Sequence, residues 1–160
     1  MNQKFTDALK IISKKMENKN ISWILIGSTS LALQGVNLEP EDIDILTDKE
    51  GVFEINKILK QYEIQSIKTN PSKLFKSHLS QYLINDVKVE VMGDFIFRSK
   101  LTNEWLSLDS MLQSYYLIET QKAKIPIFSL EKSVKIYEQW GREKDLIKIQ
   151  MIRKTLNIKR

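Results

Sequence analysis

The chain has 160 residues, of which 42% are hydrophobic and 28% are charged, a balance typical of one globular domain that buries its own core. Cysteine is absent and His78 is the single histidine, which excludes disulfides, thiolate zinc sites and multi-histidine metal sites. The net charge of +5 favours anionic ligands such as nucleotides or RNA, although scattered lysines are equally typical of a solubilising surface.

The N-terminal segment is charged and amphipathic. Residues 3–18 place Phe5, Leu9 and Ile12 at helical spacing, which predicts a helix. The chain contains no run of about 20 apolar residues, and its first residues do not form an apolar signal segment. We therefore expect a cytoplasmic protein that does not cross a membrane.

A glycine-serine pair separates the first predicted strand from a short helix. The apolar run over 21–26 is brief and rich in β-branched residues, which predicts a buried strand that ends at Gly27. Ser28 is the expected N-cap of a helix over 28–34. Residues 42–46 then alternate between polar and apolar side chains, as a strand does.

The rest of the chain is first strand-rich and then helical. Strand-forming residues dominate 63–97, and Asn85-Asp86 predicts a hairpin turn within that stretch. Ser129 is the expected N-cap of the C-terminal helices, which are separated near Gly141. The other expected elements are a helix over 49–62, strands over 114–119 and 125–128, and helices over 130–140 and 143–157.

This order of elements predicts an α+β fold, in which a mixed β-sheet is flanked by helices and followed by C-terminal helices. It differs from the regular strand–helix alternation of a doubly wound parallel sheet. We expect a single domain over residues 1–160, with a core over about 21–128 and the C-terminal helices over about 129–158.

Three carboxylates are the main candidates for chemistry. Asp42 and Asp44 lie two residues apart on a predicted strand, so they point to one face, about 6–7 Å apart. Such a pair repels unless a cation neutralises it, and Mg²⁺ or Mn²⁺ prefers carboxylate and phosphate oxygens. Glu90 points away from the valines of the strand over 87–92. It completes a three-carboxylate metal site if that strand lies beside the one over 42–46.

Two further features concern phosphate. Backbone N–H groups at a helix start bind phosphate well, which makes Gly27-Ser28 the expected nucleotide-binding turn. Lys88 shares a strand face with Glu90, where it would either steer a triphosphate or neutralise the acids. Taken alone, a Gly-Ser pair is usually a simple turn, and an Asp-x-Asp pair is often a solvated strand edge.

The combined pattern resembles the signature of the nucleotidyltransferase superfamily, whose fold is similar to the polymerase-β palm. An apolar strand leads into Gly27-Ser28, thirteen residues (29–41) follow, and then comes Asp42-Ile43-Asp44-Ile45. The superfamily includes the antibiotic adenylyltransferases and small bacterial or archaeal nucleotidyltransferase-like proteins. The resemblance implies that Asp42 and Asp44 are metal ligands, that Glu90 is the third catalytic acid, and that Gly27 and Ser28 bind the nucleotide phosphates.

A second, weaker match lies near the C-terminus. Gly141-Arg142-Glu143-Lys144-Asp145 resembles the Gly-Arg-x-Lys-Asp segment of the abortive-infection and small nucleotidyltransferase-like proteins, where a helix with this motif closes the active-site cleft. The resemblance implies substrate or phosphate contacts for Arg142, Lys144 and Asp145. The alternative is a charge cluster in which the acids suit the positive end of the helix dipole.

These features predict a metal-dependent nucleotidyltransferase that transfers an NMP, expected to be AMP, from an NTP, expected to be ATP. The acceptor is unidentified and would be a small molecule, an RNA 3′ end or a protein side chain. The alternative is a catalytically weak or inactive nucleotide- or partner-binding module of the same fold, for example one half of a toxin–antitoxin-like pair. A homodimer or a helical partner protein would then complete the cleft. A third option is RNA binding driven by net charge.

Overall fold

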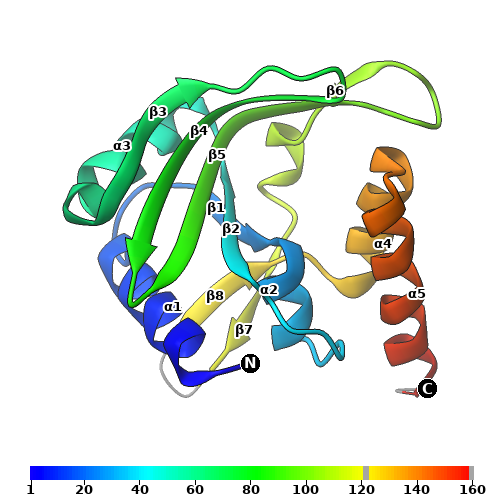
Figure 1. The fold of residues 1–160 in the computed structure, drawn as a ribbon, viewed down its shortest axis with the longest axis horizontal. Helices are drawn as coiled ribbons and strands as arrows, with labels where there is room; N and C mark the ends of the chain where they lie inside the picture. The colour runs from blue at the N-terminus through cyan, green and yellow to red at the C-terminus, as the bar shows by residue number, and fades with distance from the viewer. Residues whose placement is uncertain (121–122, 159–160) are drawn as a thin grey trace.

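The computed structural model describes residues 1–120 and 123–158, which form a mixed β-sheet with helices on both faces (Figure 1). The helices are α1 (Gln3–Met16), α2 (Gly27–Leu33), α3 (Lys49–Leu59), α4 (Leu130–Trp140) and α5 (Glu143–Ile158), with 3-10 turns η1 (Lys60–Tyr62) and η2 (Asp109–Met111). The strands are β1 (Trp23–Ile26), β2 (Asp42–Thr47), β3 (Glu63–Thr69), β4 (Phe75–Ile84), β5 (Val87–Arg98), β6 (Trp105–Ser107), β7 (Tyr116–Glu119) and β8 (Lys124–Ile127). The predicted α+β class is confirmed.

The sheet mixes parallel and antiparallel pairs. Its strand order is β3-β4-β5-β2-β1-β8-β7, and β6 pairs with β5 outside this path. Strand β2 runs parallel to β5 and antiparallel to β1. The β4–β5 hairpin turns at Asn85 and Asp86, whose φ values of 51° and 60° are those that a tight two-residue hairpin turn requires. The hairpin predicted at this pair is confirmed.

Side-chain caps account for the starts of three helices. Asn2 accepts a hydrogen bond from Phe5 N (3.4 Å), and Asp48 accepts one from Gly51 N (2.6 Å). Ser129 accepts one from Lys132 N at 3.1 Å, which confirms its predicted role at the start of α4.

The predicted N-cap of α2 is wrong. The helix begins at Gly27, one residue earlier than expected, and Ile26 is its N-cap without any side-chain bond. Ser28 is therefore already helical. The reason is that Gly27 adopts a φ of +71°, which lets the chain turn directly from β1 into the helix.

The sheet separates two hydrophobic cores. One face packs against α1 and α3 through residues such as Ile12, Val52 and Ile55. The other packs against α2, α4 and α5 through residues such as Leu31 and Ile152. Figure 1 shows these two helix layers on opposite sides of the sheet. Among the described residues, no helix combines the length and the apolar character needed to span a bilayer.

The long β5 strand connects the sheet to the C-terminal helices. Its far part carries an irregularity opposite Lys76 and His78, where Asp94 has a φ of +52°. Beyond it, β5 and the loop that follows reach over toward α4 (Figure 1), and Lys100 N donates to Gln139 O at 2.7 Å. A cleft is thereby enclosed between the sheet and the C-terminal helices.

Candidate metal and nucleotide site

Strand register brings the three predicted carboxylates together. The parallel β2–β5 pair sets Asp42 opposite Lys88 and Asp44 opposite Glu90. One oxygen from each of Asp42, Asp44 and Glu90 lies within 4.8 Å of the others, and all three side chains are half-buried. The alternate residues of both strands, such as Ile43 and Val89, are fully buried on the opposite face, which holds this register in place.

The electrostatics of this acidic cluster are unfavourable without a cation. Burial, followed by the charges of Asp42 and Glu90, raises the pKa of Asp44 from 3.8 to about 7. Burial and then the Glu90 charge also raise the pKa of Asp42. Three converging carboxylate oxygen donors suit a hard divalent cation such as Mg²⁺ or Mn²⁺, which would relieve this repulsion.

Two neighbouring side chains hold Glu90. Lys88 Nζ lies 2.5 Å from Glu90 Oε1, and Gln81 on β4 donates from Nε2 to the same oxygen at 2.8 Å. The hydrogen bond to Glu90 raises the pKa of Lys88. Of the two roles considered for Lys88, its position beside the carboxylate favours that of charge neutraliser.

Gly27 lies directly against the acidic cluster. Its neighbour Ile26 pairs with Asp44 across the β1–β2 ladder. A Cβ at Gly27 would overlap the Asp44 carboxylate, and the φ of +71° is strained for any other L-residue. A glycine is therefore required for the backbone to approach Asp44 so closely. Ser28 follows within the first turn of α2 and is half-buried.

A cleft of about 210 Å³ opens over the acidic cluster. Asp44, Glu90 and Gly27 belong to its lining. Its aromatic side chains are Phe75, Phe95, Tyr137 and Trp140, its basic ones are Arg142, Lys144 and Lys148, and its neutral polar ones are Asn70 and Ser77. The Trp140 ring lies at the centre of the aromatic wall, with ring centroids 5.4–5.8 Å from those of Phe75, Phe95 and Tyr137.

The Gly-Arg-x-Lys-Asp segment forms one end of this cleft. Asp145 is fully buried and accepts from Arg142 Nε at 2.7 Å, from the second guanidinium nitrogen at 2.8 Å, and from the Arg142 backbone N–H at 3.1 Å. The guanidinium carbon lies 4.7 Å from the Phe75 ring centroid and 5.1 Å from that of Trp140. Arg142 and Lys144 line the cleft, whereas Asp145 lies behind Arg142 and fixes its orientation.

Sequence reasoning missed Lys148. It lies one helical turn after Lys144 on α5, lines the cleft, and is half-buried. Burial lowers its pKa, and Asp44 is the charge that opposes this shift most. Within the described residues, Lys148 makes no ion pair, so its ammonium group is available to an anion in the cleft. The i, i+4 spacing of Lys144 and Lys148 is the sequence signal by which it could have been found.

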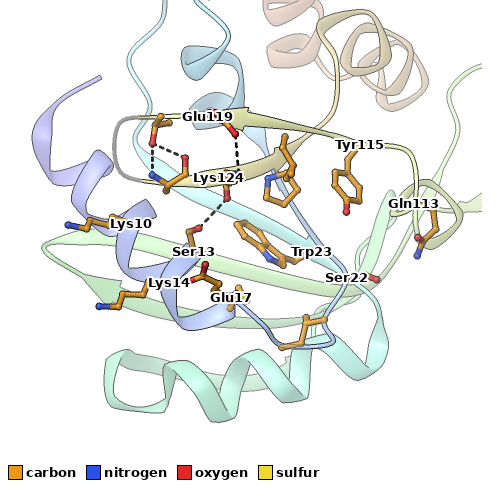
Figure 2. Close-up of a pocket in the computed structure, with 16 residues that line it drawn as sticks. Lys10, Ser13, Lys14, Glu17, Ser22, Trp23, Gln113, Tyr115, Glu119 and Lys124 are labelled. Carbon is orange, nitrogen blue, oxygen red and sulfur yellow. Dashed lines mark hydrogen bonds and ion pairs between the residues drawn. The ribbon is translucent and has the colours of Figure 1, made fainter.

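A larger cavity of about 660 Å³ lies elsewhere, between α1, the start of β1 and strand β7 (Figure 2). Trp23, Tyr115 and Leu117 supply apolar lining, and Lys124 pairs with Glu119 across the β7–β8 hairpin at 3.2 Å. The acidic cluster contributes nothing to this lining. Volume alone therefore does not select a site, and the converging carboxylates make the smaller cleft the candidate.

The chain resembles known proteins in both sequence and fold. The family model described as aminoglycoside-2''-adenylyltransferase matches residues 8–152. The crystal structure of a protein from Thermotoga maritima, described as a candidate nucleotidyltransferase, is 33% identical, with a TM-score of 0.80. The match covers 98% of this chain and 96% of that one. A comparison with curated proteins found no match.

More distant solved structures share the fold. The antibiotic-resistance factor ANT(2'')-Ia is 12% identical with a TM-score of 0.55, over 98% of this chain and 86% of that one. Its complex with adenylyl-2''-tobramycin is 13% identical with a TM-score of 0.54, over 97% and 90% of the two chains. At these identities the likeness shows the fold alone.

Proposed function

The chain belongs to the aminoglycoside-2''-adenylyltransferase family, within the nucleotidyltransferase superfamily that its sequence motifs resemble, and we propose that it transfers AMP from ATP to a hydroxyl acceptor. The observation that carries the proposal is the convergence of Asp42, Asp44 and Glu90 beside Gly27 at the base of a basic cleft.

Asp42, Asp44 and Glu90 would hold Mg²⁺ or Mn²⁺. The donor set fits, because all three residues offer carboxylate oxygens that lie close enough to share an ion. When bound, the ion supplies positive charge for the phosphate oxygens and for the pyrophosphate that leaves.

The other cleft residues offer backbone N–H groups and cationic side chains to a nucleotide. The backbone at Gly27 and Ser28 would hold donor phosphates, because Gly27 approaches Asp44 closely at the start of α2. Lys148 would bind the same phosphates, since it is the cation that offsets the charge of Asp44 most. Lys144, one turn before Lys148 on α5, and Arg142, just before the helix begins, also line the cleft.

The reaction then follows from these placements. The acceptor oxygen forms a bond to the α-phosphorus, the bond from this phosphorus to the bridging oxygen breaks, and pyrophosphate leaves with the electron pair. Glu90 is the best-placed carboxylate to take the hydroxyl proton. Lys88 and Gln81 hold Oε1 of Glu90, so Oε2 is the oxygen that remains for the ion or for that proton.

The test is a calorimetric titration of ATP, with and without Mg²⁺, followed by measurement of pyrophosphate release with candidate acceptors. Asp42→Ala/Asp44→Ala should lose metal-dependent ATP binding. The matched control is Glu50→Ala/Glu54→Ala, which removes two exposed carboxylates from α3. Binding that survives in the Asp42/Asp44 variant would refute the site. Binding by the unaltered chain without turnover on any acceptor would favour a nucleotide-binding module instead.

A further inference from the structure

Tyr137 brings a hydroxyl group without a protein partner to the cleft. Its side chain is only 4% exposed, and it belongs to the cleft lining. In the described part of the chain, the hydroxyl makes no hydrogen bond, yet its oxygen is not among the unpaired atoms sealed in the interior. It therefore opens to the cleft. Buried hydroxyl groups are normally paired with protein, water or a ligand, because an unpaired one costs free energy. The Tyr137 hydroxyl is thus available to a molecule in the cleft.

This hydroxyl lies on the side of the cleft where nucleotide phosphates are expected. Tyr137 and Gly27 line both the cleft and a smaller cavity next to it, so α4 faces the start of α2 at this point. Lys148 Nζ lies 5.5 Å from the Tyr137 ring centroid. Burial, followed by the charges of Asp145 and Asp44, raises the pKa of Tyr137. The hydroxyl is therefore near both the Gly27 turn and the acidic cluster.

Its surroundings make Tyr137 a fixed hydrogen-bond donor. The Trp140 ring meets the Tyr137 ring edge-on, with centroids 5.4 Å apart, and the Lys148 ammonium group lies over the same ring. A ring that is already packed loses little conformational freedom when a ligand binds. Because the pKa is raised, the hydroxyl keeps its proton at neutral pH and can donate it in a hydrogen bond to an anionic oxygen.

We propose that Tyr137 is a phosphate-binding residue of the nucleotide site, whose hydroxyl donates a hydrogen bond to a phosphate oxygen of ATP on the Gly27 side of the cleft. This inference rests on the proposed AMP transfer, which requires ATP in the cleft. The hydroxyl keeps its proton and forms no covalent bond. A hydrogen bond to a charged phosphate is stronger than one between neutral groups, so its loss should weaken ATP binding by roughly tenfold.

Tyr137→Phe tests this, because it removes the hydroxyl and keeps the ring. We expect calorimetry to show a roughly tenfold loss of Mg²⁺-dependent ATP affinity. The melting temperature should not fall, since the free protein loses no hydrogen bond.

The matched control is Tyr82→Phe, in the core between the sheet and α1 and α3. The fully buried Tyr82 hydroxyl donates to Ser80 Oγ at 2.9 Å and accepts from Asn56 Nδ2 at 3.1 Å. Its removal should lower the melting temperature by about 2–4 °C and leave ATP affinity unchanged.

Phosphorus NMR identifies the part of the nucleotide that the hydroxyl contacts. With a saturating non-hydrolysable ATP analogue and Mg²⁺, the phosphorus signals should differ between Tyr137→Phe and the unaltered protein, and should coincide for Tyr82→Phe. Unchanged ATP affinity in Tyr137→Phe, or a lower affinity with unchanged phosphorus signals, would overturn the inference. A fall in melting temperature as large as that of the control would do the same, because the hydroxyl would then be structural. Failure of the unaltered protein to bind ATP would instead remove the proposed function.

Discussion

Replacing Asp44 with asparagine tests the electrostatic account of the site without requiring any substrate. The substitution keeps the shape of the side chain and removes its charge. The structure raises the pKa of this carboxyl to about 7, chiefly through burial and then through repulsion from Asp42 and Glu90. Asp44→Asn should therefore stabilise the metal-free protein at neutral and alkaline pH, although it damages the metal site.

The magnitude follows from linkage between protonation and folding. In the unfolded chain the carboxyl titrates near 3.8, so the native state holds its proton more tightly and loses stability as pH rises from about 4 to about 7. A shift of about three pKa units corresponds to at most about 4 kcal/mol above pH 7. About 2–3 kcal/mol of this accrues between pH 5 and pH 7.

The assay is urea unfolding in the presence of a chelator at pH 5 and pH 8. The stability of Asp44→Asn relative to the unaltered protein should rise by about 2–3 kcal/mol between these two values. Asp86→Asn, an exposed aspartate in the β4–β5 turn, should show no comparable pH dependence. An Asp44→Asn variant that gains nothing at pH 8 relative to pH 5 would refute the reasoning. Saturating Mg²⁺ should stabilise the unaltered protein more than the variant.

Substitutions at three further positions test other parts of the site. Gly27→Ala should abolish Mg²⁺-dependent ATP binding and lower stability by about 1–3 kcal/mol, because its Cβ meets the Asp44 carboxylate at a positive φ. If calorimetry finds normal ATP affinity in this variant, the placement of Gly27 against the nucleotide site is wrong. Asp145→Asn should lower the free energy of unfolding by about 1–3 kcal/mol, since Arg142 loses its bidentate partner, and denaturant titration measures the loss. Lys148→Met should weaken ATP binding by roughly tenfold with no loss of stability, because it removes a desolvated charge. Lys148→Arg should restore part of the affinity, and an unchanged dissociation constant for the methionine variant would exclude the phosphate contact.

The strand face on which each carboxylate lies was predictable, because period-2 alternation determines which side chains of a strand share a face. Ile43 and Val89 must be buried, so Asp44 and Glu90 must face away from that core on their respective strands. The parallel pairing of β2 with β5 was only a condition in the sequence argument. It depends on a long crossover through α3, β3 and β4, and local patterns do not specify such a connection.

Other features depended on the three-dimensional context. The local sequence does not show whether Ser28 caps α2 or is already its second residue. The positive φ of Gly27 decides where the helix starts. How deeply Lys148 is buried depends on which face of α5 packs against the sheet. The apolar residues of α5 are spread almost evenly around the helix, so the sequence does not indicate that face. The orienting role of Asp145 likewise appeared only when its burial was known.

The central claim is that Asp42, Asp44 and Glu90 together bind the divalent ion that accompanies a nucleotide. Crystals grown with Mn²⁺ and a non-hydrolysable ATP analogue would test it most directly through an anomalous difference map. We expect a manganese peak within coordination distance of all three carboxylates, with the phosphates on the Gly27 side of the cleft. A bound nucleotide with manganese away from these carboxylates, or with no manganese at all, would exclude them as the metal site.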